Sequence, residues 1–253
     1  MPEKLSAERF VKELEAHRSS EQREKYRRYF KTGEDQYGEG DVFIGVRMGQ
    51  VFALAKEFID MPPNEIEELL ESGVHKVRAG ALSIMDKQAR LKKTPESRRK
   101  ELFDLYLRRT DRIDNWDLVD LGAPYVVGCY LFDKPRDILY ELARSDSMWE
   151  RRTAIVSTSY FIRQGDPSDT FEIAEILLGD DQDLIHKPTG GWLREAGKKD
   201  GQRLLSYLDK HAATMPRTAL RYAIEHLDEE QRDHYLNKKK APEAGQDQEG
   251  DRS

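Results

Sequence analysis

The chain has 253 residues, and its 42 Lys and Arg against 48 Asp and Glu give a net charge of -6 at pH 7. This charge argues against nonspecific coating of DNA, but a local basic face remains open because binding follows the local field. There is no run of about 18 apolar residues to span a membrane. The amino terminus also lacks an apolar signal segment, so we expect a cytoplasmic protein. The single cysteine, Cys129, excludes an internal disulfide and a cysteine-based zinc site.

The hydrophobic pattern predicts helices along most of the chain. Residues 3–30 predict one charged amphipathic helix, and 31–41 predict a loop because they are rich in glycine and polar residues. Helical spacing of apolar residues then recurs over 48–60, 64–72, 74–91, 95–108, 115–132, 135–144, 148–163, 168–178, 183–198, 200–211 and 215–227. No segment shows sustained alternation or hairpin turns, so we predict an all-α fold.

Several of these predicted helices begin alike. Segments that start at Val74, Met148, Leu184 and Met215 each enter with an apolar residue and then place basic and small residues. They recur at roughly 30–40 residues, the period of HEAT-like helical repeats, and 115–120 fills the gap between the first two. We therefore predict a HEAT-like repeat solenoid with a concave basic face. The alternative is a plain helical bundle whose basic residues coincide by chance.

The stretch from Asp114 to Asp120 combines an aromatic ring with carboxylates at a predicted helix start. Asp114 or Asn115 can cap the first turn, because their side-chain oxygens accept hydrogen bonds from free backbone N–H groups. Trp116 and Asp120 are four residues apart and share one helix face. An aromatic face and an anionic oxygen would then look into the same space. In the alternative interpretation Trp116 is core, Asp117 is solvated, and Asp120 caps a helix or pairs with an arginine.

Basic residues recur at the predicted helix starts in the second half of the chain. Arg151 and Arg152 begin one helix, where a planar guanidinium can clamp a phosphate through two oxygens. An ion pair with an acid of a neighbouring repeat is the alternative. The region 187–221 favours a track for a polyanion, although solvated helix faces explain part of its charge. Its basic residues are Lys187, Arg194, Lys198, Lys199, Arg217 and Arg221.

Gly190 and Gly191 precede Trp192 within a predicted helix. A glycine inside a helix costs roughly 1 kcal/mol relative to alanine. The pair therefore indicates that a bulky group approaches the backbone, that Trp192 needs room to turn, or that two helices pack tightly.

Several classes of active site lack their required residues. The six histidines are scattered without metal-ligand spacing, and phosphate-binding glycine loops and the Gly-x-Ser-x-Gly elbow are missing. We expect neither a metal nor a cofactor. After residue 236 the composition becomes polar and charged, which predicts one domain over 1–236 and a disordered tail over 237–253.

Five short motifs occur in a fixed order along the chain. They are Phe43-Ile44-Gly45-Val46-Arg47, Val77-Arg78-Ala79, Asn115-Trp116-Asp117-Leu118-Val119-Asp120, Trp149-Glu150-Arg151-Arg152-Thr153-Ala154-Ile155, and His186-Lys187 with Leu193-Arg194-Glu195. Together they resemble the DNA alkylation repair family typified by AlkD, over about residues 8–230. The Trp-Asp-x-Val-Asp and Trp-x-x-Arg-x-Ala-Ile blocks are fairly specific in combination.

This resemblance implies a HEAT-like repeat fold that cradles duplex DNA. It also implies a glycosylase that hydrolyses the N-glycosidic bond of positively charged alkylated purines, such as 3-methyladenine and 7-methylguanine. The base would not be drawn into a pocket, in contrast to most glycosylases. By resemblance, Asp120 is the catalytic aspartate, Trp116 faces the sugar and Arg152 contacts a phosphate. Because an open solenoid that wraps DNA can act alone, we expect a monomer without an obligatory protein partner, nucleoid-associated when bound to DNA.

Further DNA contacts are expected from the matching motifs and from the basic region. These residues are Arg47, Arg78, Arg151, Lys187, Trp192, Arg194, Arg217 and Arg221. The chain departs from the family at one of them. Aligned on Leu193-Arg194-Glu195, the tryptophan is displaced by one residue and Gly191 holds its place. One residue is about 100° of helix rotation, so Trp192 either faces the core or regains its position through a local shift.

Two other functions compete with the glycosylase. A non-catalytic binder of branched or distorted DNA is motivated by the displaced tryptophan. A protein-binding HEAT scaffold is motivated by the acidic net charge, and its association with a partner would be insensitive to salt.

Overall fold

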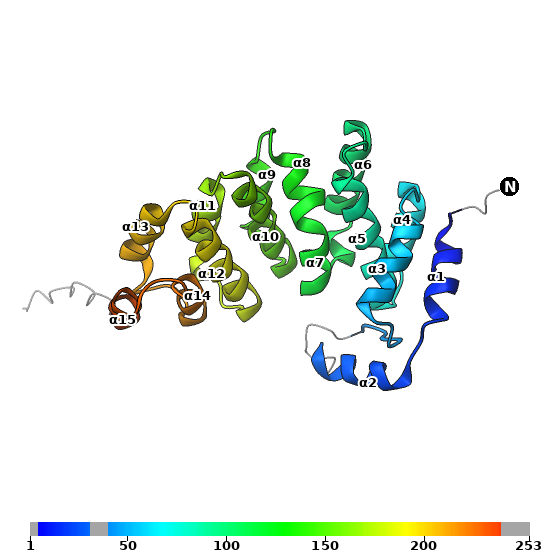
Figure 1. Cartoon of the computed structure of the whole chain (residues 1–253), viewed down its shortest axis with the longest axis horizontal. Coiled ribbons are helices and arrows are strands. Elements are labelled where there is room, and N and C mark those ends of the chain that lie inside the picture. Colours follow the sequence, from blue (N-terminus) through cyan, green and yellow to red (C-terminus); the bar gives the residue numbers. More distant parts are fainter. Residues whose placement is uncertain (1–4, 31–39, 239–253) are drawn as a thin grey trace, which may run out of the picture.

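The chain folds into helices that lie side by side in a curved row (Figure 1). The computed structural model describes residues 5–30 and 40–238. Within them the extended pairing is confined to an isolated bridge between Val42 and Val74. The predicted all-α fold is confirmed and is consistent with a helical repeat, whereas the HEAT class of that repeat stays a prediction. Among the described helices none is long and apolar enough to cross a membrane.

The helices of the first half, up to the centre of the row, are α1 (Ala7–Glu15), α2 (Ser20–Tyr29), α3 (Met48–Glu57), α4 (Pro63–Leu70), α5 (His75–Arg90), α6 (Glu96–Arg108), α7 (Trp116–Gly122) and α8 (Cys129–Leu131). Those of the second half are α9 (Asp137–Leu142), α10 (Met148–Gln164), α11 (Ser168–Ile176), α12 (Asp183–Gly197), α13 (Gly201–His211), α14 (Arg217–Ala223) and α15 (Glu229–Asn237). Short segments of other helix types are η1 (Thr110–Arg112), the π-helix η2 (Ala123–Gly128) and η3 (Leu177–Gly179).

The similar segments found in the sequence begin helices that contact one another in chain order. Helix α5 packs against α3 and α7, α7 packs against α10, α10 against α12, and α12 against α14. The segments starting at Val74, Met148, Leu184 and Met215 lie at or beside the first turns of α5, α10, α12 and α14, and Asn115 is the N-cap of α7. Their recurrence therefore reflects one repeated packing arrangement, which brings equivalent helix starts together along the row.

The single helix predicted over 3–30 is wrong, because the chain turns between α1 and α2. Ser19 caps α2 by accepting a hydrogen bond from the Gln22 amide at 3.3 Å, and its own amide donates to the Ile44 carbonyl. Gly45, with φ of +76°, crosses so closely that a Cβ there would lie 1.9 Å from the Ser19 carbonyl oxygen. This long-range crossing, which the local pattern cannot reveal, lies at the N-cap of α2.

The predicted continuous helix over 115–132 is also interrupted. Helix α7 runs into the π-helix η2, and α8 completes the segment. Pro124 lies in the first turn of η2 and has no amide hydrogen, so it cannot continue the regular ladder of α-helical hydrogen bonds. A π-helical turn widens the helix locally and is common near functional sites. Here it follows directly after the helix that carries Trp116 and Asp120.

The carboxy-terminal boundary stays a prediction. Helix α15, which the sequence pattern did not reveal, runs from Glu229 to Asn237, and its N-cap Asp228 accepts a hydrogen bond from the Gln231 amide. The predicted tail lies almost entirely outside the described residues, as does most of the loop predicted over 31–41.

Two adjacent glycines of α12 have different surroundings. A Cβ on Gly190 would lie 2.2 Å from the Ala219 carbonyl oxygen of α14, whereas a Cβ on Gly191 would meet nothing within 4 Å. The sequence left three explanations for the glycine pair. Gly190 fits tight packing between two helices.

We expect Gly190→Ala to destabilise the protein by about 1–3 kcal/mol, because α12 and α14 must separate to admit the methyl group. Gly191→Ala is the matched control, and it should stabilise by up to about 1 kcal/mol through helix propensity. The measurement is the free energy of unfolding in urea. Equal effects of the two substitutions would contradict the close approach of α12 and α14.

Candidate functional site

The carboxylate of Asp120 is held by a guanidinium from the neighbouring repeat. Arg152 of α10 donates from Nε to Oδ1 at 3.0 Å and from Nη2 to Oδ2 at 2.9 Å. A third donor of Arg152, on Nη1, binds the Leu184 carbonyl. The Asp120 side chain is nevertheless 39% exposed. Burial raises the pKa of the Asp120 carboxyl above its ordinary value, and the paired Arg152 opposes this rise.

Asp120 borders two hollows that each also hold a tryptophan, and a further hollow of about 360 Å³ that is lined by Phe52, Ser83, Asp86, Lys87, Arg90 and Leu121. The first, which we call the aromatic hollow, measures about 350 Å³ and is lined by Tyr26, Tyr29, Phe30, Phe52, Trp116 and the edge of Asp120. Trp116 stacks on Phe30 with ring centroids 5.9 Å apart and meets Tyr29 edge-on at 6.0 Å. The same-face placement predicted for Trp116 and Asp120 is therefore found, with both side chains bordering this hollow.

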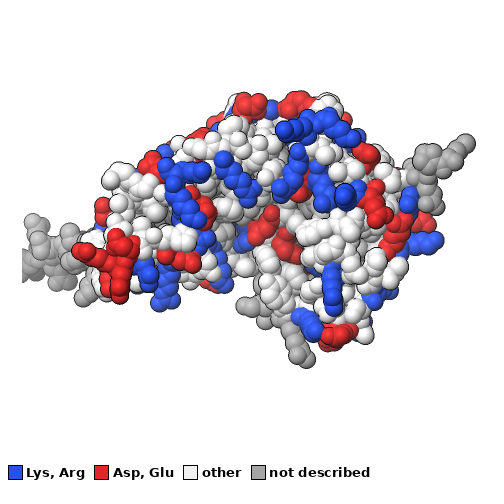
Figure 2. Space-filling model, viewed as in Figure 1, with Lys and Arg blue, Asp and Glu red and all other residues white. Residues whose placement is uncertain are grey.

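The second hollow lies on the other side of Asp120. This basic hollow measures about 620 Å³, and its lining includes Arg152, Arg163, Lys187, Arg194, Trp192 and Tyr222. Trp192 shares the hollow with Asp120 and Arg152, so the one-residue displacement does not turn it into the core. Figure 2 shows a hollowed surface on the concave side of the row, where acidic and basic groups are interspersed.

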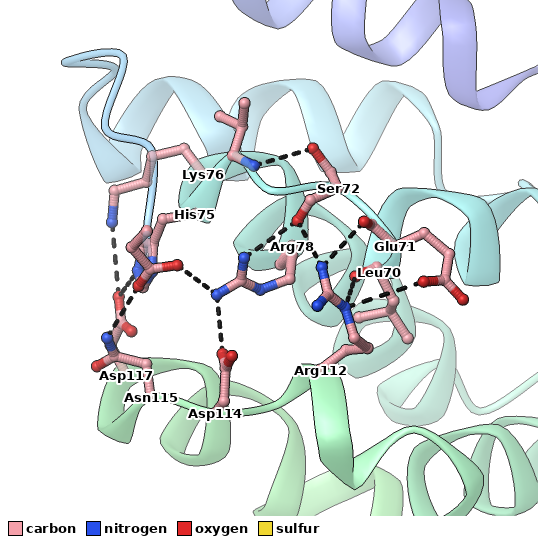
Figure 3. A network of polar contacts seen from close by, with 12 residues as sticks. Leu70, Glu71, Ser72, His75, Lys76, Arg78, Arg112, Asp114, Asn115 and Asp117 are labelled. Carbon is pink, nitrogen blue, oxygen red and sulfur yellow. Dashed lines mark hydrogen bonds and ion pairs between the residues drawn. The ribbon is translucent and has the colours of Figure 1, made fainter. Parts of the chain in front are cut away.

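A buried network of ionic groups fixes the start of α7 (Figure 3). His75, the first residue of α5, binds Asp41 through Nδ1 at 3.0 Å and Asp117 through Nε2 at 2.9 Å. Lys76 reaches Asp117 at 3.5 Å. The Asn115 side-chain amide donates to Asp41 at 3.3 Å. The network thereby ties the turn that carries Trp116 to α5 and to the segment before α3.

The carboxylates of this network oppose the effect of burial on His75, whereas burial lowers the pKa of Lys76. Burial lowers the pKa of His75, but hydrogen bonds to Asp117 and Asp41 outweigh it and leave the pKa above its ordinary value. Burial alone would raise the pKa of Asp117 and of Asp41, but His75 and the neighbouring cations lower both. The two carboxylates therefore favour the charged form of His75.

Two arginines expected to contact DNA are engaged elsewhere. The Arg78 side chain is only 3% exposed and binds Asp41 at 2.5 Å and Asp114 at 2.8 Å, so it belongs to the buried network. Arg151 binds Asp180 at 2.6 Å and donates to backbone carbonyls of the loop before α10. Its neighbour Arg152 points toward Asp120 instead, because successive helix residues differ by about 100°.

The remaining predicted contacts lie on accessible surface. Lys187 pairs with Asp183 at 2.6 Å, and Arg194 binds Glu195 and Glu225, while both line the basic hollow. Arg47, Arg217 and Arg221 are exposed. These positions satisfy a necessary condition for binding a polyanion.

Several residues of the site were missed from the sequence. Tyr29 and Phe52 of the aromatic hollow come from α2 and α3, which lie far from α7 in the chain. Arg90 and Arg163 lie over the ring of Tyr125 at 3.5 Å and 5.6 Å. Only the fold brings these residues together, so spacing along the chain gave no signal for them. In the part of the chain that the structure describes, no group of three His, Cys, Asp or Glu could hold a metal ion.

This geometry defines a helical repeat protein in which an arginine holds a carboxylate at the edge of several surface hollows. A family model described as DNA alkylation repair enzyme matches residues 10–227, so the chain belongs to the DNA alkylation repair enzyme family. A solved structure, the predicted DNA alkylation repair enzyme from Enterococcus faecalis, has 17% identity and a TM-score of 0.65, over 84% of this chain and 98% of that one. No curated protein matches the sequence. Family membership supports a role in DNA repair and indicates an enzyme.

We expect His75→Gln to destabilise the protein by about 3–5 kcal/mol, because it leaves two buried carboxylates without their shared cation. Since the folded-state pKa of His75 is raised, its contribution is complete below the ordinary value of 6.5 and is lost as the pH rises through the folded-state value. The difference in unfolding free energy between wild type and variant should therefore shrink with rising pH.

Urea unfolding of both proteins at about pH 6 and about pH 9 measures this difference. Asp41 and Asp117 do not disturb this comparison, because their pKa values are lowered. Their contribution to stability is lost only when the pH falls below the ordinary value of 3.8. A constant difference from about pH 6 to about pH 9 would show that His75 does not carry the shared charge.

Proposed function

We propose that the protein is a DNA glycosylase that excises positively charged alkylated purines from duplex DNA by hydrolysis of the N-glycosidic bond. The observation that carries the proposal is Asp120, a carboxylate that is 39% exposed, held in place by Arg152 and one helical turn from Trp116. Membership of the DNA alkylation repair enzyme family supports it. The reaction needs duplex DNA and water, and we propose that the protein acts on it as a monomer.

The substrate supplies its own leaving group. The glycosidic bond breaks with its electron pair going to the purine, whose positive charge is thereby neutralised, so no general acid is required. The deoxyribose becomes an oxocarbenium-like cation. Asp120 stabilises this cation and accepts a proton from the water that attacks C1′, as a carboxylate does in glycoside hydrolysis. Trp116 offers an electron-rich face to the same developing charge.

Arg152 has two tasks in this proposal. Three of its five N–H donors already bind Asp120 and Leu184, so its first task is to orient the carboxylate. Arg152 also lines the basic hollow, where a phosphate beside the lesion would be bound as its second task. Lys187 and Arg194 line the same hollow and would extend this contact along the strand.

The position of Trp192 supports the glycosylase over the competing DNA-binding function. That alternative was motivated by the displacement of the tryptophan, yet Trp192 lines the basic hollow beside Arg152. The damaged nucleotide would thus meet an aromatic ring on each side of Asp120.

We expect Asp120→Asn to retain binding to duplex DNA and to lose base release by about 100-fold or more, because the amide cannot stabilise the sugar cation. The measurement is release of 7-methylguanine and 3-methyladenine from methylated duplex DNA under single-turnover conditions. Asp104→Asn is the matched control, since Asp104 is an exposed carboxylate paired with Lys100 on α6. Wild-type rates in Asp120→Asn would refute the assignment.

The pH dependence of base release provides a second test. The carboxylate form of Asp120 is the active form, and burial raises the pKa of this group. The rate should therefore fall as the pH is lowered, with a midpoint above the ordinary value of 3.8. Release of 7-methylguanine is suited to this measurement because its leaving group needs no protonation. The residual activity of Asp120→Asn should not show this fall in rate at low pH. An unchanged fall in the variant would mean that another group titrates.

A further inference from the structure

Cations of the basic hollow are paired with carboxylates of the protein itself. Three of the cationic side chains that line the hollow are held in such ion pairs, namely Arg152 with Asp120, Lys187 with Asp183, and Arg194 with Glu195 and Glu225. The interspersed acidic and basic groups on the concave side are visible in Figure 2. A phosphate that binds one of these cations must therefore compete with a carboxylate of the protein.

The pair between Arg194 and Glu225 connects α12 to the residues that follow α14. The two residues are 31 positions apart in the chain, and the Arg194 guanidinium donates from Nη1 to the Glu225 carboxylate. The Glu225 side chain is 55% exposed and that of Arg194 is 23% exposed. Because Gly190 allows α12 to pack closely against α14, the fold keeps the two side chains within reach of each other.

The Glu225 carboxylate can be removed without breaking another ion pair. Within the described residues its ion-pair partner is Arg194, whereas Glu195 also accepts hydrogen bonds from Lys198 at 2.7 Å and 2.8 Å. Without Glu225, Arg194 would still pair with Glu195 through Nε at 3.2 Å. Exposed ion pairs contribute little to stability because water screens them. Glu225 therefore matters more for what Arg194 can bind than for the fold.

We propose that Glu225 competes with the DNA backbone for Arg194 and thereby weakens binding to undamaged duplex. This inference rests on the duplex-binding part of the proposed function, and it adds a residue that limits affinity. It concerns phosphate contacts alone and makes no use of the base. A protein that must search undamaged DNA gains from such a limit, because tight nonspecific binding would hold it away from lesions.

The competition also changes how binding depends on salt. When a phosphate takes the place of Glu225 on Arg194, the DNA releases a bound counterion, but the freed carboxylate attracts a cation from solution. The net release of ions is then smaller than the number of phosphate contacts alone would give. Binding by the wild type therefore depends less steeply on salt than binding by a variant without this carboxylate.

The test measures equilibrium binding of the full-length protein to an undamaged duplex between about 50 and about 200 mM salt. Glu225→Gln should bind about two- to fivefold more tightly than wild type at about 100 mM salt, which is the range expected for loss of one exposed ion pair. The slope of log K against log salt concentration should become steeper by up to about one unit.

Glu175→Gln is the matched control for net charge. Glu175 is a 49% exposed carboxylate of α11 that pairs with Lys210 of α13, and it does not line the basic hollow. Its substitution changes the net charge by the same amount as Glu225→Gln, but affinity and salt slope should stay at the wild-type values. An equal gain in both variants would assign the effect to net charge and overturn the competition.

A double substitution tests whether Arg194 is the cation concerned. In an Arg194→Gln background, Glu225→Gln should have no more effect than Glu175→Gln, because its partner is gone. A gain that persists there, or unchanged binding by Glu225→Gln alone, would overturn the proposal. Release of 7-methylguanine is measured separately. Its absence from a wild type that binds duplex would reject the glycosylase and leave the competition standing, whereas a wild type that binds no duplex would reject both.

Discussion

The buried ionic network around His75 is the constraint on which the site depends. It brings together three basic side chains, those of His75, Lys76 and Arg78, and three carboxylates, those of Asp41, Asp114 and Asp117. Burying these charges is costly, so the network is stable only when its geometry and its balance are complete. Because Asp114 and Asp117 flank Trp116, this requirement sets both the position and the rotation of the first turn of α7.

The rotation of α7 then determines the positions of Trp116 and Asp120. Trp116 is placed on Phe30, and one turn later Asp120 emerges at the edge of the hollows. Arg152 reaches Asp120 across the packing of α7 against α10, so the carboxylate is oriented by the next repeat along the row. Asp120 is therefore positioned by two helices, α7 that carries it and α10 that supplies Arg152. The site depends on the side-by-side packing of these two helices.

The sequence predicted the features that depend on local spacing. The all-α pattern, the recurring helix starts and the shared face of Trp116 and Asp120 follow from helical periodicity. Contacts between distant segments were not accessible in this way. Asp41 binds Asn115 from 74 residues away, and Gly45 crosses the chain at Ser19, the N-cap of α2. The same limit explains why Arg78 was assigned to DNA, since its pairing with Asp41 depends on tertiary structure.

The pairing of Asp120 with Arg152 is compatible with catalysis because of the charge of the proposed substrate. Glycoside hydrolases use two carboxylates, one of which must be protonated to expel a neutral leaving group. An alkylated purine is already cationic, so one carboxylate suffices and it must remain ionised. Arg152 favours that ionised form while leaving Asp120 partly exposed toward the sugar. Selectivity for cationic purines would then arise from the reaction itself, since a neutral purine at the same place would find no acid to release it.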